Sequence, residues 1–168
     1  IYRDLAVIKR VAIAGTDQPL ADRRAALAAV DVAGRPMRVL AAEDNRTNQL
    51  VFQKMVRDID IDLTFANNGL EAVALFQSFR PDLIFMDISM PEMDGREAAR
   101  AIRALESGHI PIVAMTAHAM DGDEDGILAA GIDRYLTKPL RKASILDTLA
   151  EFCPHDARTI RLDAENAA

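Results

Sequence analysis

Short apolar runs alternate with amphipathic helical runs along residues 37–153, and the alternation repeats five times. Runs that are apolar along nearly their whole length are typical of strands buried on both faces. A strand followed by a helix and another strand is the unit that builds a parallel sheet with helices on both faces. The sequence therefore predicts one doubly wound α/β domain with a five-stranded parallel sheet.

The expected elements follow from these runs and from the residues that interrupt them. We expect strands over residues 37–42, 62–66, 83–87, 112–116 and 134–137. We expect helices over residues 47–59, 69–79, 96–105, 122–130 and 141–152. Glycines at 95, 108 and 131 stand at helix ends, where glycine commonly interrupts helical structure.

The two ends of the chain are expected to lie outside this domain. Residues 1–36 could form a helix, a short strand and an Ala-rich helix over 2–10, 11–14 and 20–30. Two interpretations stay open for them: a linker that packs on the domain or on a second copy in a homodimer, or the tail of a preceding, degenerate copy of the domain. The sequence starts at Ile1 rather than Met, so we expect it to be part of something longer. Residues 154–168 read as a tail, frayed over its last 14 residues.

Composition restricts the partners and the compartment. A formal net charge of -6 disfavours binding to nucleic acid, which needs a surplus of clustered Lys and Arg. No apolar run approaches the roughly 20 residues that cross a bilayer, so we expect no membrane contact. Cys153 is the single cysteine, which excludes an internal disulfide and suits a reducing compartment such as the cytoplasm.

Polar residues close the expected strands in a pattern that indicates a site. Glu43 and Asp44 follow the first strand, Asp87 ends the third, Thr116 ends the fourth and Lys138 follows the fifth. The carboxyl ends of parallel strands lie along one edge of the sheet, so these side chains should meet.

The chemistry of this set favours a divalent cation and a phosphoryl group. Three neighbouring carboxylates repel one another unless a cation neutralises them, and ligation by oxygen alone suits Mg²⁺. A hydroxyl and a lysine beside them suit the charge of a transferred phosphoryl group. The residues taken singly leave other interpretations open: Glu43 and Asp44 could cap the following helix, and Asp87 could cap a turn.

Residues 37–153 resemble the receiver domain of response regulators in two-component signalling. The resemblance rests on four blocks: residues 43–45, residues 86–95 (MDISMPEMDG), residues 115–117 and residues 135–139 (YLTKP). It implies a flavodoxin-like fold with strand order 2-1-3-4-5. Residues 43–49 (EDNRTNQ) and 116–120 are more similar to receivers of hybrid histidine kinases than to those of DNA-binding regulators.

The resemblance also implies roles for single residues. Asp87 would be the phospho-acceptor, which takes a phosphoryl group from a histidine kinase or a histidine phosphotransfer protein. Mg²⁺ would be held by Glu43, Asp44, Asp87 and the backbone carbonyl of Ser89. Thr116 and Lys138 would stabilise the phosphoryl charge, and Thr116 and Tyr135 would then switch the surface of the fourth helix, fifth strand and fifth helix.

Alternatives to a hybrid kinase receiver also stay open. The chain could be a stand-alone single-domain response regulator with an N-terminal extension. It could instead be an aspartyl-phosphate phosphatase, although the second acid expected two residues after the nucleophile is Ser89 here. As the receiver of a hybrid kinase, the domain itself would be a signalling phospho-acceptor. Any kinase activity would then belong to the parent protein.

Overall fold

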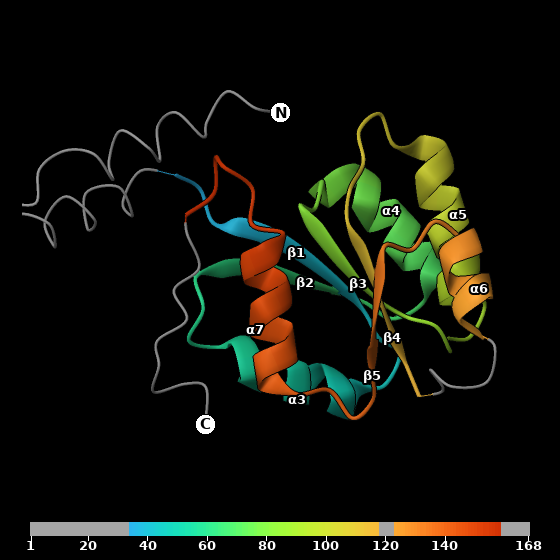
Figure 1. Ribbon diagram of the computed structural model, residues 1–168, viewed down its shortest axis with the longest axis horizontal. Coiled ribbons are helices and arrows are strands. Elements are labelled where there is room, and N and C mark those ends of the chain that lie inside the picture. Colours follow the sequence, from blue (N-terminus) through green and yellow to red (C-terminus); the bar gives the residue numbers. More distant parts are fainter. Residues whose placement is uncertain (1–33, 118–122, 159–168) are drawn as a thin grey trace, which may run out of the picture. The chain divides into compact units, whose positions relative to one another are not determined.

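The computed structural model describes residues 34–117 and 123–158. Their strands form one five-stranded sheet in the order β2-β1-β3-β4-β5, with every neighbouring pair parallel. Figure 1 shows helices on both faces of this sheet. The flavodoxin-like doubly wound architecture and the strand order implied by the sequence are therefore confirmed.

The elements alternate along the chain without exception in the described residues. The strands are β1 (Met37–Ala42), β2 (Ile61–Ala66), β3 (Leu83–Asp87), β4 (Ile112–Thr116) and β5 (Arg134–Thr137). The helices are α3 (Arg46–Val56), α4 (Gly69–Phe79), α5 (Gly95–Leu105), α6 (Asp123–Ala129) and α7 (Lys142–Glu151).

Four of the five strands have the bounds predicted from the sequence, and β2 begins one residue earlier, at Ile61. The largest difference is the end of α3, which stops at Val56 rather than at Ile59. The N–H of Ile59 donates to the carbonyl of Val56 at 2.9 Å, so the chain already turns there toward β2. The elements expected within residues 1–33 lie outside the described part of the chain.

The hydrophobic core has two layers, one on each face of the sheet. Side chains alternate along β1, so that Val39 belongs to one layer and Leu40 to the other. One layer joins the sheet to α3 and α7, and the other joins it to α4, α5 and α6. In the first layer, the ring of Phe52 meets those of Phe65 and Phe85 edge to face, with centroids 6.2 and 5.1 Å apart. This contact anchors α3 on the sheet.

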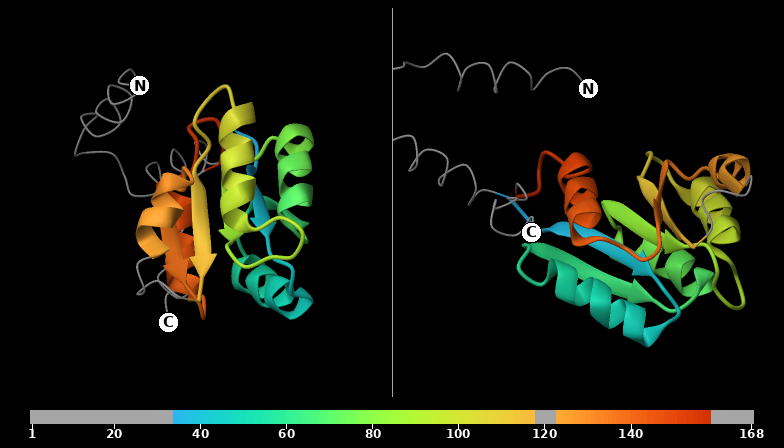
Figure 2. Two further views of the ribbon diagram at one scale, coloured as in Figure 1. Left: turned by 90° about the vertical axis from the view of Figure 1, so that its right-hand side faces the viewer. Right: turned by 60° about the horizontal axis from the view of Figure 1, so that its bottom comes forward.

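Parallel pairing brings the carboxyl ends of all five strands to one edge. The arrowheads in Figure 2 point the same way along the sheet. The loops after β1, β3, β4 and β5 therefore lie side by side at this edge. None of the helices within the described residues is long and apolar enough to cross a membrane.

The start of α5 lies directly against the end of β3. Asp94 caps the helix by accepting from the N–H of Glu97, whose side chain accepts from the N–H of Asp94 in return. The N–H of Gly95 donates to the carbonyl of Ile88 at 3.0 Å. A Cβ at Gly95 would lie 2.2 Å from the carbonyl oxygen of Asp87, so only glycine fits here without a backbone shift.

The opposite edge of the sheet is fastened by Arg35. Its guanidinium makes a two-pronged contact with the carboxylate of Asp82, at 2.6 and 2.8 Å, and its Nε donates to Asp156 at 3.0 Å. Arg35 also forms a parallel bridge with Ala157, and its carbonyl accepts from the N–H of Arg158 at 2.8 Å. Residues 155–158 are thus bonded to the domain, whereas the polar composition of the last 14 residues predicted fraying from residue 155 onward.

We expect Asp82→Asn to lower the free energy of unfolding at neutral pH by about 1–3 kcal/mol, the range for losing a charged hydrogen-bonded partner. Burial alone would raise the pKa of Asp82, but Arg35 and the N–H of Arg38 hold it below the ordinary value of 3.8. The stabilisation is therefore complete above pH 3.8 and is lost as the pH falls below that value. Denaturant unfolding at several pH values would measure it.

The matched control is Asp58→Asn, which removes one partner of the exposed Arg57–Asp58 ion pair. We expect this change to cost less than about 1 kcal/mol, as is usual for surface ion pairs. Equal effects of the two substitutions would contradict the structural importance of Arg35 and Asp82.

We expect Gly95→Ala to destabilise the domain by about 1–3 kcal/mol, because the new methyl group forces the start of α5 away from the backbone of Asp87. Thermal or denaturant unfolding would show the loss. Gly108→Ala is the control, since a Cβ there meets no atom within 4 Å. A Gly95→Ala protein as stable as the Gly108→Ala protein would contradict this close approach.

Candidate functional site

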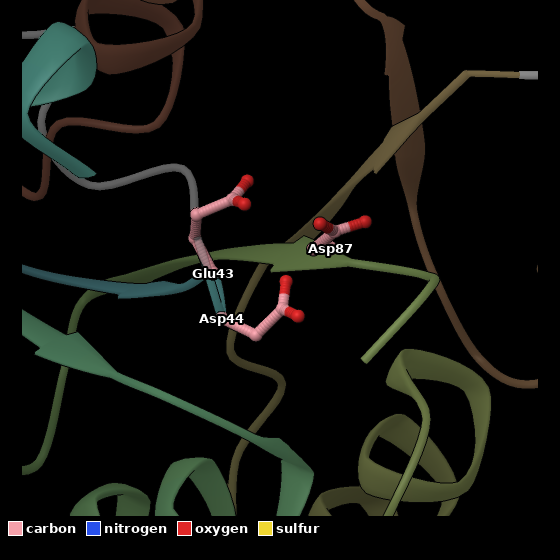
Figure 3. Close-up of side chains that lie close together, drawn as sticks. All are labelled: Glu43, Asp44 and Asp87. Atoms are coloured by element: carbon pink, nitrogen blue, oxygen red, sulfur yellow. The ribbon is translucent and has the colours of Figure 1, made fainter. Parts of the chain in front are cut away.

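Three carboxylates meet at the carboxyl edge of the sheet. Glu43 and Asp44 directly follow β1, and Asp87 is the last residue of β3. One oxygen from each lies within 4.8 Å of the others, and Figure 3 shows the three groups gathered at the two strand ends. Glu43 and Asp87 are buried, while Asp44 is exposed. The structure thus brings together acids that are 43 residues apart in the sequence.

Lys138 completes this cluster from the loop after β5. Its Nζ lies 2.8 Å from Oε2 of Glu43 and 2.5 Å from Oδ2 of Asp87. Its backbone N–H donates to the carbonyl of Thr116 at 2.7 Å, which fixes the loop against the end of β4. One lysine therefore bridges acids from two strands.

Burial and charge both perturb the groups in the cluster. Burial raises the pKa of Asp87 above its ordinary value, the nearby charge of Glu43 raises it further, and hydrogen bonds from Lys138 and Ser89 oppose the rise. Burial alone would lower the pKa of Lys138, but its hydrogen bonds to Asp87 and Glu43 raise it. Burial is thus the main reason that the pKa of Asp87 is raised although Lys138 lies against its carboxylate.

The donor set fits a divalent cation that prefers oxygen ligands. Three carboxylates face one lysine in the cluster, so a doubly charged ion would balance the remaining charge. Asp44 is exposed while one of its oxygens lies in the cluster, as expected of a ligand to an ion that keeps several waters. Mg²⁺ matches this combination of ligands.

The other predicted site residues lie on the neighbouring strands and loop. Ser89 follows Asp87 by two residues, and its N–H donates to Oδ1 of Asp87 at 3.1 Å, so Asp87 also holds a tight turn. Thr116 is buried at the end of β4, opposite Thr137 of β5. Tyr135 is half-buried on β5 and packs against the core layer under α4, α5 and α6.

The helix after the acid pair is capped by a different residue. The side chain of Asn45 accepts from the N–H groups of Thr47 and Asn48, at 2.9 and 3.3 Å. The interpretation of Glu43 and Asp44 as helix caps is therefore wrong, and both carboxylates are available to the site.

Sequence reasoning missed two amide side chains that support the acids. Asn48 donates to Oε1 of Glu43 at 2.9 Å, and Gln49 donates to the backbone carbonyl of Glu43 at 2.7 Å. Both follow the acid pair within one helical turn. The signal in the sequence was the spacing of Gln49 three and seven residues before Phe52 and Val56, which puts an amide on the buried face of the helix, where it needs a partner.

Comparison with known proteins agrees with the fold. The profile of the response regulator receiver domain matches residues 39–150. Hybrid signal transduction histidine kinase I of Dictyostelium discoideum is 40% identical over 122 residues, which are 68% of this chain and 7% of that protein. Sensor protein GacS of Pseudomonas syringae is 36% identical over 141 residues, which are 82% of this chain and 16% of that protein. The chain thus spans a small part of these two relatives.

A shorter relative is matched along nearly its whole length. The polar-differentiation response regulator DivK of Brucella anthropi is 36% identical over 118 residues, which are 70% of this chain and 96% of that protein.

Among solved structures, the receiver domain of sensor histidine kinase PA1611 from Pseudomonas aeruginosa is 38% identical, with a TM-score of 0.65 over 70% of this chain and 97% of that one. That structure has a magnesium ion coordinated in its active-site cleft. The receiver domain of Ssk1 from Saccharomyces cerevisiae, in complex with the histidine phosphotransfer protein Ypd1, is similar at 32% identity and a TM-score of 0.65, over 71% of this chain and 90% of that one. With the strand order and the acid cluster described above, these matches show that the chain belongs to the family of response regulator receiver domains.

Proposed function

We propose that Asp87 accepts a phosphoryl group from a phosphohistidine on a partner protein. The supporting observation is a buried carboxylate in contact with Lys138, beside two further acids, at the carboxyl edge of a receiver-type sheet. An oxygen of Asp87 would form the new P–O bond while the P–N bond of the phosphohistidine breaks. The histidine nitrogen keeps the electron pair of that bond, and the product on this chain is an acyl phosphate.

The residues around Asp87 have complementary roles in this transfer. Glu43, Asp44, Asp87 and the backbone carbonyl of Ser89 would hold Mg²⁺, which supplies positive charge to the phosphoryl oxygens when bound. Lys138 already contacts Asp87 and adds a second positive charge there. Thr116, buried at the end of the next strand, would offer its hydroxyl to a phosphoryl oxygen.

Thr116 also offers a route from the site to the surface. Movement of this side chain toward the phosphoryl group would vacate space for Tyr135, which is half-buried on the adjacent strand. The two positions of Tyr135 would present different surfaces of α6, β5 and α7 to a partner. Phosphorylation thereby becomes a change in partner affinity.

The partner would dock on α3 beside the site. Leu50 and Val51 on this helix are 48% and 45% exposed. Val51 also lines a largely apolar cavity of about 510 Å³ that reaches from α3 to Pro139 and Leu140 and has Lys138 and Glu43 in its wall. A helix that carries a phosphohistidine could bury its apolar side chains here and place the phosphoryl group at Asp87. The Ypd1–Ssk1 complex, between a phosphotransfer protein and a similar receiver, supports this type of partner.

We favour a hybrid histidine kinase as the parent protein. The similarity to GacS covers 82% of this chain, although the receiver profile covers only about two thirds of it, so the likeness continues beyond the receiver itself. The alternative, a stand-alone regulator, has its support in DivK, which is matched along 96% of its length.

Incubation with acetyl phosphate and Mg²⁺ would test the proposed acceptor. We expect intact mass to rise by one phosphoryl group, and the rise to be absent with EDTA or in Asp87→Asn, because both remove a required part of the site. Beryllofluoride should bind the wild-type chain and not the variant. No mass change in the wild-type chain would contradict the proposal. Steady turnover of a phosphoester in place of a stable adduct would also contradict it and would favour a phosphatase.

The docking surface makes a separate prediction. We expect Val51→Glu to slow phosphotransfer from a phosphorylated histidine phosphotransfer protein by about tenfold or more, the effect of losing a central interface residue. Phosphorylation by acetyl phosphate should change less than about twofold, because Asp87 is untouched. Gln53→Glu places the same charge on another exposed position of α3 and should leave both rates unchanged. Equal rates for the two variants with the protein donor would rule out this surface.

A further inference from the structure

We propose that Asn48 is a positioning residue for the acid pair: its side-chain amide holds the Glu43 carboxylate in the orientation needed for binding Mg²⁺. The inference rests on the proposed function and assigns a role within the same site. It concerns a residue that contacts neither the phosphoryl group nor, directly, Asp87.

The hydrogen bonds of Glu43 are the basis of this assignment. Oε1 accepts from Nδ2 of Asn48 at 2.9 Å and from the N–H of Asn45 at 3.2 Å. Oε2 accepts from Nζ of Lys138 at 2.8 Å. The side chain of Glu43 is 5% exposed, so water can do little to replace these partners. Asn48 supplies the shorter of the two bonds to Oε1, and together with Lys138 on Oε2 it fixes how the carboxylate is turned.

Asn48 is suited to this role because it stands on a rigid element. Its own N–H donates to the side chain of Asn45, which fixes the first turn of α3. One turn further along the same face of the helix, Phe52 packs against Phe65 and Phe85 of the sheet. Capping at one end and aromatic packing at the next turn hold the stretch of helix from which the amide of Asn48 projects toward Glu43.

The charge of the donor matters as much as its position. An amide holds Glu43 without neutralising it, so the negative charge stays available to a cation. Lys138 is the other side-chain partner of Glu43, and it also contacts Asp87, the residue that would be phosphorylated. When Lys138 turns toward an incoming phosphoryl group, Asn48 keeps Glu43 in place.

Gln49 has a different task in the same turn. It is 3% exposed and donates to the backbone carbonyl of Glu43 and to the side chain of Asn67, at 2.7 and 2.9 Å. These bonds hold the loop after β1 against the loop after β2. Gln49 therefore supports the backbone of Glu43, whereas Asn48 supports its carboxylate, and only substitution of Asn48 should separate metal binding from stability.

Calorimetric titration of the full chain with Mg²⁺ alone would test the proposal. We expect Asn48→Ala and Asn48→Leu to raise the Kd for Mg²⁺ by about 10-fold or more, as is usual when a partner of a metal ligand is lost. Both replacements are good helix formers, so the midpoint of thermal unfolding in EDTA should stay close to that of the wild type. Thr47→Ala changes an exposed neighbour in the same turn and should leave the Kd within twofold.

Three other results would overturn the proposal. A Kd within twofold of the wild type for both Asn48 variants would show that the amide does not position Glu43. A raised Kd together with a clear fall of the thermal unfolding midpoint in EDTA would assign Asn48 to the folding of α3 rather than to metal binding. Absence of Mg²⁺ binding by the wild-type chain would contradict the proposed function itself, and this inference with it.

Discussion

The contact of Lys138 with Glu43 and Asp87 is the interaction on which the site depends. Parallel pairing forces the ends of β1 and β3 together, and with them two buried carboxylates that would otherwise repel each other. The lysine reaches both from the loop after β5. Because it balances only part of the charge, the edge is left with a surplus that suits a cation and, with it, a phosphoryl group. The side chain of Lys138 therefore links the arrangement of the strands to the charge of the site.

The surroundings of this contact are divided between the two faces of the sheet. On one face, α3 presents Asn48 to the acids and exposed Leu50 to solvent. On the other face, the start of α5 lies so close to Asp87 that a glycine is required at position 95. A donor would approach over α3 on the first face. The change at Thr116 and Tyr135 would be felt at α6 on the second face and at α7, which shares the first face with α3. Only the α6 part of the output would therefore lie on a face away from the donor.

The sequence predicted the strands and the residues at their ends because both depend on local patterns. A short apolar run bounded by turn residues fits few structures other than a strand buried on both faces. Parallel strands bring their carboxyl ends to one edge of the sheet, whichever loops connect them. Contacts between distant residues could not be predicted in this way. The pairing of Arg35 with Asp82 joins positions 47 residues apart, and no pattern in the nearby sequence marks either residue as half-buried or paired. The amide of Asn48 was missed for another reason: Asn in a first helical turn usually indicates capping, and here Asn45 has that role.

The contacts of Arg35 with Asp156 and Ala157 have a consequence for how the domain would bear a mechanical load. Gly34 and Arg158, the first and last residues of the described domain, lie together beside the amino ends of the strands. Asp87 lies at the opposite, carboxyl edge of the sheet. A mechanical force on either end would act first on the contacts of Arg35 with Asp82, Asp156 and Ala157. The loops around the acids would not bear it. Contacts made at Gly34 and Arg158, at the edge of the sheet opposite Asp87, therefore leave the acids free of mechanical strain.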